Sequence, residues 1–232
     1  MGYNLQDMKK VALIDIDRTI YDGFSIVDLV RAQNELGIIE DSVYEKLANF
    51  YKSFKAGNIP YDSASCDALN LWAKELQGKS YAEVKALTET ILCKTDKFHK
   101  FTLRLVQLLH DKGFHCVVVT GEPQFVGDYF LNVVDADSLC SSVYECEGDY
   151  FTGNVTQALC GSEGKEGAIR DTLDGCEVST AFGDSEGDVG ILNMVNFPFC
   201  VNPSDGLMKI AKERHWPTCS TDNVLDVVAS ML

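Results

Sequence analysis

Two aspartates stand close together directly after a short apolar run near the start of the chain. Residues 11–14 read VALI, and Asp15 and Asp17 follow with one residue between them. An apolar run with β-branched residues predicts a buried strand, and carboxylates two residues apart at its end would share one face. Two such carboxylates are both ionised only beside a cation. The pair is as consistent with a Mg²⁺ site made of oxygen ligands as with a solvated acidic turn.

Further polar residues follow other predicted strands at the same place, the carboxyl end. Thr120 ends an apolar run over 114–120, and Gly121 comes next. Asp184 and Asp188 lie in the segment GDSEGD, which follows a short predicted strand at 179–182. Ligands of open α/β sheets bind beyond the carboxyl ends of the strands. We therefore expect these three separated segments to meet at one edge of a sheet.

Helical periodicity dominates between the first predicted strand and residue 95. The pattern predicts helices at 24–36, 41–56, 63–76 and 80–94, the first three ending at glycines 37, 57 and 78. Ser80 and Glu83 have the spacing of a capping box at the start of the fourth helix. We interpret residues 23–95 as an α-helical cap domain, inserted into a core domain formed by residues 1–22 and 96–232.

Strands and helices alternate in the second core segment. The sequence predicts strands at 114–120, 138–143, 179–182 and 197–201, and helices at 98–111, 123–134, 165–175, 188–195, 204–213 and 222–231. Residues 144–155 have the composition of a β-hairpin that turns at 147–149. This order predicts an α/β fold, a doubly wound parallel sheet with helices on both faces and right-handed crossovers.

The composition excludes several classes of function. The 232 residues carry a formal net charge of −15, which disfavours binding to nucleic acid or to anionic membrane surfaces. No apolar stretch approaches the length of a membrane span, and residues 1–10 lack the apolar core of a secretory signal, so we expect a cytoplasmic protein. The nine cysteines show no zinc-binding spacing and predict no disulfide framework.

Four motifs occur in the order seen in the haloacid dehalogenase-like superfamily of phosphohydrolases. They are DIDRT at 15–19, VVVTG at 117–121, a lysine at the start of a late helix, and GDSEGD at 183–188. The helical insertion, the hairpin with YFTGNV and the tail FCVNPSDGLMKIAKERHWP resemble the phosphoserine-phosphatase-like branch of that superfamily. The resemblance extends over nearly the whole chain, and the four motifs together are far more specific than any one of them.

The resemblance implies a role for each motif residue. Asp15 corresponds to the nucleophile that forms an aspartyl-phosphate. Asp17 corresponds to the general acid and base, and its backbone carbonyl would face the metal. The Mg²⁺ cofactor would be held by Asp15, Asp17 and Asp184, and Asp188 would orient the metal shell. Phosphoryl oxygens would be bound by Thr120, by the N–H of Gly121 and by Lys165.

Substrate recognition is where the sequence departs from that branch. Phosphoserine phosphatases carry a glutamate shortly after the first motif, which binds the amino group of the substrate, and here Phe24 stands in its place. Arg18, between the motif acids and Thr19, is a candidate substrate contact. We predict a Mg²⁺-dependent phosphatase for a small phosphorylated metabolite other than phosphoserine. A phosphotransferase and a non-catalytic phosphometabolite-binding protein are the alternatives, and the oligomeric state is not predicted.

Overall fold

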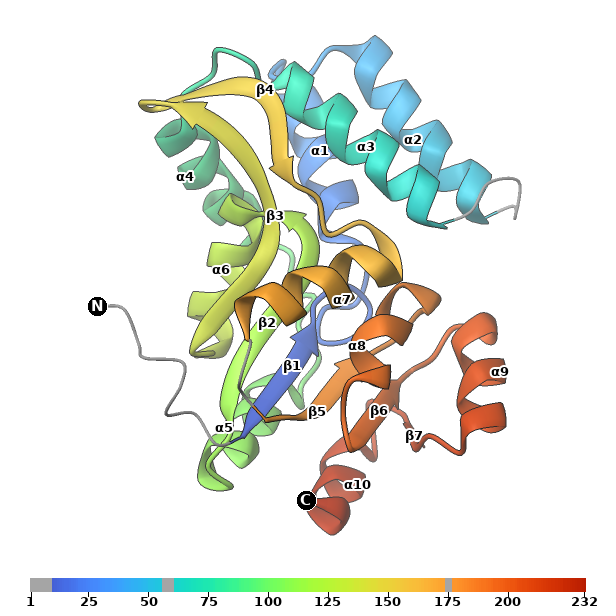
Figure 1. Cartoon of the computed structure of the whole chain (residues 1–232). Coiled ribbons are helices and arrows are strands. Elements are labelled where there is room, and N and C mark those ends of the chain that lie inside the picture. The colour runs from blue at the N-terminus through green and yellow to red at the C-terminus, as the bar shows by residue number, and fades with distance from the viewer. Residues whose placement is uncertain (1–9, 56–60, 174–176) are drawn as a thin grey trace.

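The computed structural model describes residues 10–55, 61–173 and 177–232 (Figure 1). In these ranges one sheet contains seven strands in the order β4-β3-β2-β1-β5-β6-β7. Neighbouring strands are parallel, except for the antiparallel pair β3–β4. The strand bounds are β1 (Val11–Asp15), β2 (His115–Pro123), β3 (Ser138–Glu147), β4 (Tyr150–Gln157), β5 (Val178–Gly183), β6 (Phe197–Val201) and β7 (Thr218–Cys219).

Helices cover both faces of the sheet, as the alternation of elements predicts. Ala12 and Ile14 of β1 belong to a buried cluster shared with α5, α6 and α10, whereas Val11 and Leu13 belong to a second cluster shared with α7, α8 and α9. Each face of β1 is thus buried, which explains why its sequence is continuously apolar. The bounds are α5 (Thr102–Asp111), α6 (Gln124–Val134), α7 (Gly161–Thr172), α8 (Val189–Asn193), α9 (Asp205–Arg214) and α10 (Val224–Met231).

Within the described residues, four helices separate β1 from α5 in the chain, and α1, α2 and α3 lie beyond the end of the sheet at which β1 stops (Figure 1). Trp72 of α3 packs edge-to-face against Phe125 and Tyr144, and the Tyr144 hydroxyl donates to the Leu69 carbonyl at 2.8 Å. These contacts pack α3 against α6 and against strand β3. The bounds are α1 (Ser25–Glu35), α2 (Asp41–Lys55), α3 (Tyr61–Glu75) and α4 (Tyr81–Leu92).

The predicted α/β class is confirmed, and three local features differ from the sequence interpretation. The predicted strand at 138–143 and the first arm of the hairpin form one strand, β3, because its first half pairs with β2 and its second half with β4. Strand β7 is too short to give a pattern. Lys165 lies inside α7, which begins at Gly161 and does not open at Lys165. The predicted helix ends at Gly57 and Gly175 lie outside the described residues.

No helix within the described ranges combines the length and the apolar composition that crossing a membrane requires.

Candidate active site

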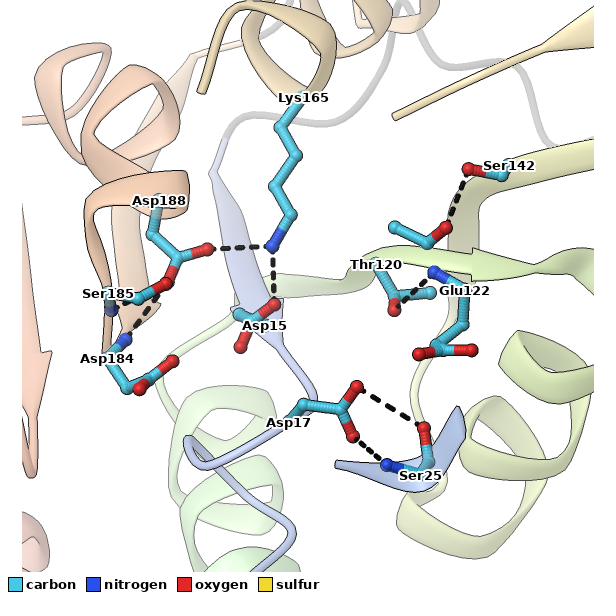
Figure 2. A network of polar contacts seen from close by, with 11 residues as sticks. Asp15, Asp17, Ser25, Thr120, Glu122, Ser142, Lys165, Asp184, Ser185 and Asp188 are labelled. Carbon is cyan, nitrogen blue, oxygen red and sulfur yellow. Dashed lines mark hydrogen bonds and ion pairs between the residues drawn. The ribbon is translucent and has the colours of Figure 1, made fainter. Parts of the chain in front are cut away.

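The ammonium group of Lys165 joins two carboxylates that come from different parts of the chain (Figure 2). Its Nζ lies 2.5 Å from Oδ1 of Asp15 and 2.7 Å from Oδ1 of Asp188. Asp15 is the last residue of β1, Lys165 projects from α7, and Asp188 follows β5. All three side chains are almost fully buried, so the ion pairs are shielded from solvent. The fold thus brings Asp15 and Lys165, which are 150 positions apart in the sequence, within hydrogen-bond distance of each other.

The loop after β5 orients its two aspartates through its own backbone. Oδ2 of Asp188 accepts hydrogen bonds from the backbone N–H of Asp184 at 3.0 Å and of Ser185 at 3.1 Å. A Cβ atom at Gly183 would lie 2.4 Å from the Cβ of Asp188, so only glycine allows this loop to close so tightly. One oxygen of Asp188 is therefore held by the loop while the other faces Lys165.

Three of these carboxylates form a cluster that fits a hard divalent cation. Asp15, Asp184 and Asp188 each offer an oxygen atom, and these atoms lie within 4.8 Å of one another. Oδ2 of Asp184 is buried and makes no well-aligned hydrogen bond with a described residue, although Nε of Arg18 lies 3.0 Å away. Carboxylate oxygens are the ligands that Mg²⁺ prefers in proteins. The donor set therefore fits Mg²⁺.

The pKa values of these carboxyl groups also fit a cation site. Burial, followed by the charge of Asp188, raises the pKa of Asp15 to about 7, although Lys165 opposes the shift. Burial and the charges of Asp188 and Asp15 raise the pKa of Asp184 to about 9. The cluster thus holds more negative charge than its lysine offsets, and a bound divalent cation would favour the ionised carboxylates.

Asp17 lies beyond the end of β1 and is held by the start of α1. Its Oδ1 accepts from the backbone N–H of Ser25 at 2.8 Å, and its Oδ2 lies 3.3 Å from the Ser25 hydroxyl (Figure 2). Burial raises the pKa of Asp17, and the hydrogen bonds from Ser25 oppose that shift. Its carboxylate does not belong to the three-carboxylate cluster.

Thr120 and Gly121 lie in the last part of β2 and face the same region. The Thr120 side chain is buried, and its Oγ1 accepts from the backbone N–H of Glu122 at 3.1 Å. The Gly121 carbonyl accepts from the hydroxyl of Ser142 at 2.7 Å. A Cβ atom at Gly121 would lie 3.2 Å from the Leu159 carbonyl oxygen, so the chain passes close to its neighbour at this point.

Arg18 lies beside the carboxylate cluster. Its Nε lies 3.0 Å from Oδ2 of Asp184, and its backbone has a φ of 64°, in the left-handed region. Arg18 is not among the residues that line the cavity described below. The guanidinium thus partly offsets the charge of Asp184 from the side that is exposed to solvent.

Glu122 is a buried acid of the site that the sequence interpretation missed. It is 7% exposed, and its carboxyl group interacts with that of Asp17. Burial and the neighbouring charge of Asp17 raise its pKa well above the usual range. The signal that could have revealed it is a charged residue between Gly121 and Pro123, at the end of a strand that is otherwise apolar.

A cavity of about 360 Å³ connects these residues to the helices beyond the sheet. Asp15, Asp17, Thr120, Glu122 and Lys165 line it from the core. The remaining wall comes mainly from α1, α2 and α3, and it is largely apolar. The residues of α1, α2 and α3 that form this wall include Ile26, Val27, Val30, Tyr44, Leu47, Phe50, Ala68 and Leu69.

Comparison with known proteins identifies relatives that match almost the whole length of the chain. The phosphoserine phosphatase SerB1 of Mycobacterium tuberculosis is 26% identical over 219 residues, covering 90% of this chain and 70% of the relative. A histidinol-phosphatase of Neisseria meningitidis is 23% identical over 222 residues, covering 90% of this chain and 98% of the relative. Both alignments thus extend over most of this chain, and the first leaves nearly a third of the relative unmatched.

Solved structures share the fold. A protein of unknown function from Bordetella pertussis superposes with a TM-score of 0.77 at 21% identity, covering 92% of this chain and 99% of its own. A phosphoserine phosphatase in a phospho-aspartyl intermediate analogue form superposes with a TM-score of 0.68 at 16% identity, covering 97% of this chain and 100% of its own. The family model of the haloacid dehalogenase-like hydrolases matches residues 12–193. The chain therefore belongs to the haloacid dehalogenase-like hydrolase family.

Proposed function

We propose that this protein is a Mg²⁺-dependent phosphatase that hydrolyses a small phosphomonoester through a phosphorylated Asp15. The observation that carries the proposal is the position of Lys165, 2.5 Å from Asp15 and 2.7 Å from Asp188 in a buried site that Thr120 also lines. A nucleophile beside a fixed cation and hydrogen-bond donors is what phosphoryl transfer requires. The phosphatase relatives support the same reaction class.

The first half of the reaction transfers the phosphoryl group to the protein. A carboxylate oxygen of Asp15 attacks phosphorus, so that a new oxygen–phosphorus bond forms and the bond to the ester oxygen breaks. The proton of the Asp17 carboxyl group passes to the departing oxygen, which leaves as an alcohol. Ser25 holds the Asp17 carboxyl group through both of its oxygens and fixes its direction.

The second half releases inorganic phosphate. Asp17, now a carboxylate, takes a proton from a water molecule whose oxygen attacks phosphorus, and the bond between phosphorus and Asp15 breaks. Lys165 and the backbone N–H of Gly121 stabilise the charge on the phosphoryl oxygens in both halves. Mg²⁺ held by Asp15, Asp184 and the Asp17 carbonyl, with Asp188 orienting the ligands, would neutralise further charge there.

The helices of residues 23–95 act as a cap in this proposal. They supply the apolar wall of the cavity, and such a wall excludes bulk water while the phosphoryl group is transferred to Asp15. Gly23 and Asp96, at the two connections of this segment, have φ values of 143° and 48°. Phe24 lines the cavity, and its ring already faces the guanidinium of Arg18 at 5.9 Å. An ammonium group of the substrate gains no charge partner from Phe24.

The test is phosphate release from a panel of phosphorylated metabolites, each measured in Mg²⁺ and in excess chelator. We expect turnover in Mg²⁺, loss of turnover in chelator, and a kcat/KM for phosphoserine roughly tenfold to a hundredfold below that of the best substrate. The Asp15→Asn variant, measured in the same assay, gives the background rate of phosphate release. Full activity in chelator would refute the metal assignment, and phosphoserine at the top of the ranking would refute the interpretation of Phe24.

A further inference from the structure

The wall of the cavity opposite the catalytic residues is the part of the site that the proposed mechanism leaves unused. Val30 of α1, Leu47 of α2 and Leu69 of α3 line this wall, and all three are buried, with Leu47 only 7% exposed. Ala48 and Ala68 also line this wall, and their small side chains leave room for an occupant. Arg31 and Lys52 also line the cavity and are exposed, so it opens to solvent near α1 and α2.

The cavity is larger than a phosphoryl group alone needs. A volume of about 360 Å³ lies within the range of about 300–1,000 Å³ that is usual for pockets that bind small organic molecules. The leaving group of a small polar ester such as phosphoserine would leave much of this space to water. Apolar walls bind water poorly and favour an apolar occupant, which gains from each carbon that it removes from solvent.

We propose that the substrate is a phosphomonoester with an apolar leaving group, an alkyl chain or ring that fills the space between α1, α2 and α3. This inference rests on the proposed function and names its substrate class. The phosphoryl group lies among Asp15, Thr120 and Lys165, and the carbon body extends along Val30, Leu47 and Leu69 toward the opening.

A series of straight-chain alkyl phosphates tests this inference with the wild-type protein. We expect kcat/KM in Mg²⁺ to rise about threefold to fourfold for each added methylene and to stop rising when the cavity is filled. Equal hydrolysis of methyl and octyl phosphate would overturn the inference and leave the proposed function standing. Hydrolysis of no member of the series or of the metabolite panel would overturn the proposed function itself.

Filling the cavity supplies an independent readout. The Ala68→Phe variant places a ring in the space that the long chain would occupy, so the ratio of kcat/KM for octyl phosphate to that for methyl phosphate should fall at least tenfold. The matched control is Ala86→Phe on α4, an exposed helical alanine outside the cavity, which should leave the ratio unchanged. An unchanged ratio in folded Ala68→Phe protein would contradict the inference.

A separate observation concerns Glu122, which lies where the apolar wall meets the catalytic residues. Its carboxyl group interacts with Asp17 and with the backbone N–H of Ile26, but its Oε2 atom is buried and makes no well-aligned hydrogen bond within the described ranges. The side chain lines the cavity. An unsatisfied buried oxygen is costly, and a ligand group can supply the missing bond. We infer that Glu122 is a specificity-determining residue that binds a hydroxyl group of the leaving group, because a hydroxyl can both donate to and accept from a carboxyl group.

Three matched substrates test this role: octyl phosphate, 2-hydroxyoctyl phosphate and 2-aminooctyl phosphate. We expect the wild-type protein to prefer the hydroxyl compound over octyl phosphate by roughly tenfold in kcat/KM. The Glu122→Met variant should lose this preference, and Glu122→Gln, which can still hydrogen-bond, should keep most of it. A preference that survives in Glu122→Met, or a preference for the amine over the hydroxyl, would overturn the assignment. The ratios are independent of the absolute rate, so they do not depend on how well each variant catalyses.

Discussion

Replacing Lys165 by methionine removes the buried ammonium group between Asp15 and Asp188 while keeping an unbranched side chain. The lysine side chain is 6% exposed, and those of Asp15 and Asp188 are 8% and 1% exposed. Breaking a buried ion pair by removing one partner costs about 3–5 kcal/mol, because the remaining charge has no compensation. We expect the free energy of unfolding in chelator to fall by about that amount, measured by urea denaturation.

The loss of stability in Lys165→Met protein should depend on pH in a defined direction. The folded-state pKa of Asp15 is about 7 and that of Asp184 about 9, both above the value of about 3.9 for an unfolded aspartate. The folded state therefore binds more protons, and the stability contributed by these groups is lost as the pH rises from about 4 toward 9. In Lys165→Met protein the buried carboxyl groups have lost their cation, so each must either bind a proton or carry a negative charge without a partner. The stability difference from wild type should widen from pH 5.5 to pH 8.5.

Two controls separate this effect from a general effect of losing a lysine. Lys85→Met breaks an ion pair with Asp128 whose side chains are 32% and 29% exposed, and such pairs contribute about 0–1 kcal/mol. Excess Mg²⁺ should narrow the gap between Lys165→Met and wild type, because the metal supplies positive charge to the same carboxylates. A Lys165→Met protein as stable as Lys85→Met at every pH would refute the electrostatic reasoning.

Three further predictions concern the acid, the metal and the core. Asp17→Asn should lower kcat/KM for alkyl phosphates at least tenfold more than for 4-nitrophenyl phosphate, whose leaving group needs no proton; equal losses would exclude Asp17 as the acid. Ca²⁺ should support less turnover than Mg²⁺ because its larger and looser shell misplaces the nucleophile, and equal rates with the two metals would contradict this. Trp72→Phe should cost about 1–3 kcal/mol in urea denaturation, since it removes the donor 2.9 Å from the buried Gln33 Oε1; a change below 0.5 kcal/mol would show that this bond contributes little.

Several site residues could be predicted because local pattern and topology agree at their positions. The apolar run of β1 fixes where the strand stops, and the carboxyl-end rule then places Asp15 and Thr120 at one edge of the sheet with Asp184. The structure brings these segments together, with Lys165 and Asp188 among them. The assignment of catalytic and metal-binding roles to them stays a prediction.

Other features depend on contacts that sequence spacing does not encode. Glu122 is buried because the start of α1 brings Asp17 and Ser25 against the end of β2, an approach of distant segments. Arg18 forms an ion pair with Asp184 and has a left-handed backbone, and its residue type predicts neither feature. Strand β3 runs through the predicted break because it exchanges a parallel partner for an antiparallel one.

The central claim, a phosphoryl group carried by Asp15, can be tested by chemical trapping. Protein quenched during turnover of a substrate is treated with sodium borohydride, which reduces an acyl phosphate to an alcohol, and the peptide containing residue 15 is sequenced by mass spectrometry. We predict reduction at Asp15 only when both substrate and Mg²⁺ are present, and none in Asp15→Asn protein. Active turnover with an unmodified Asp15, or modification at another carboxylate, would contradict the account.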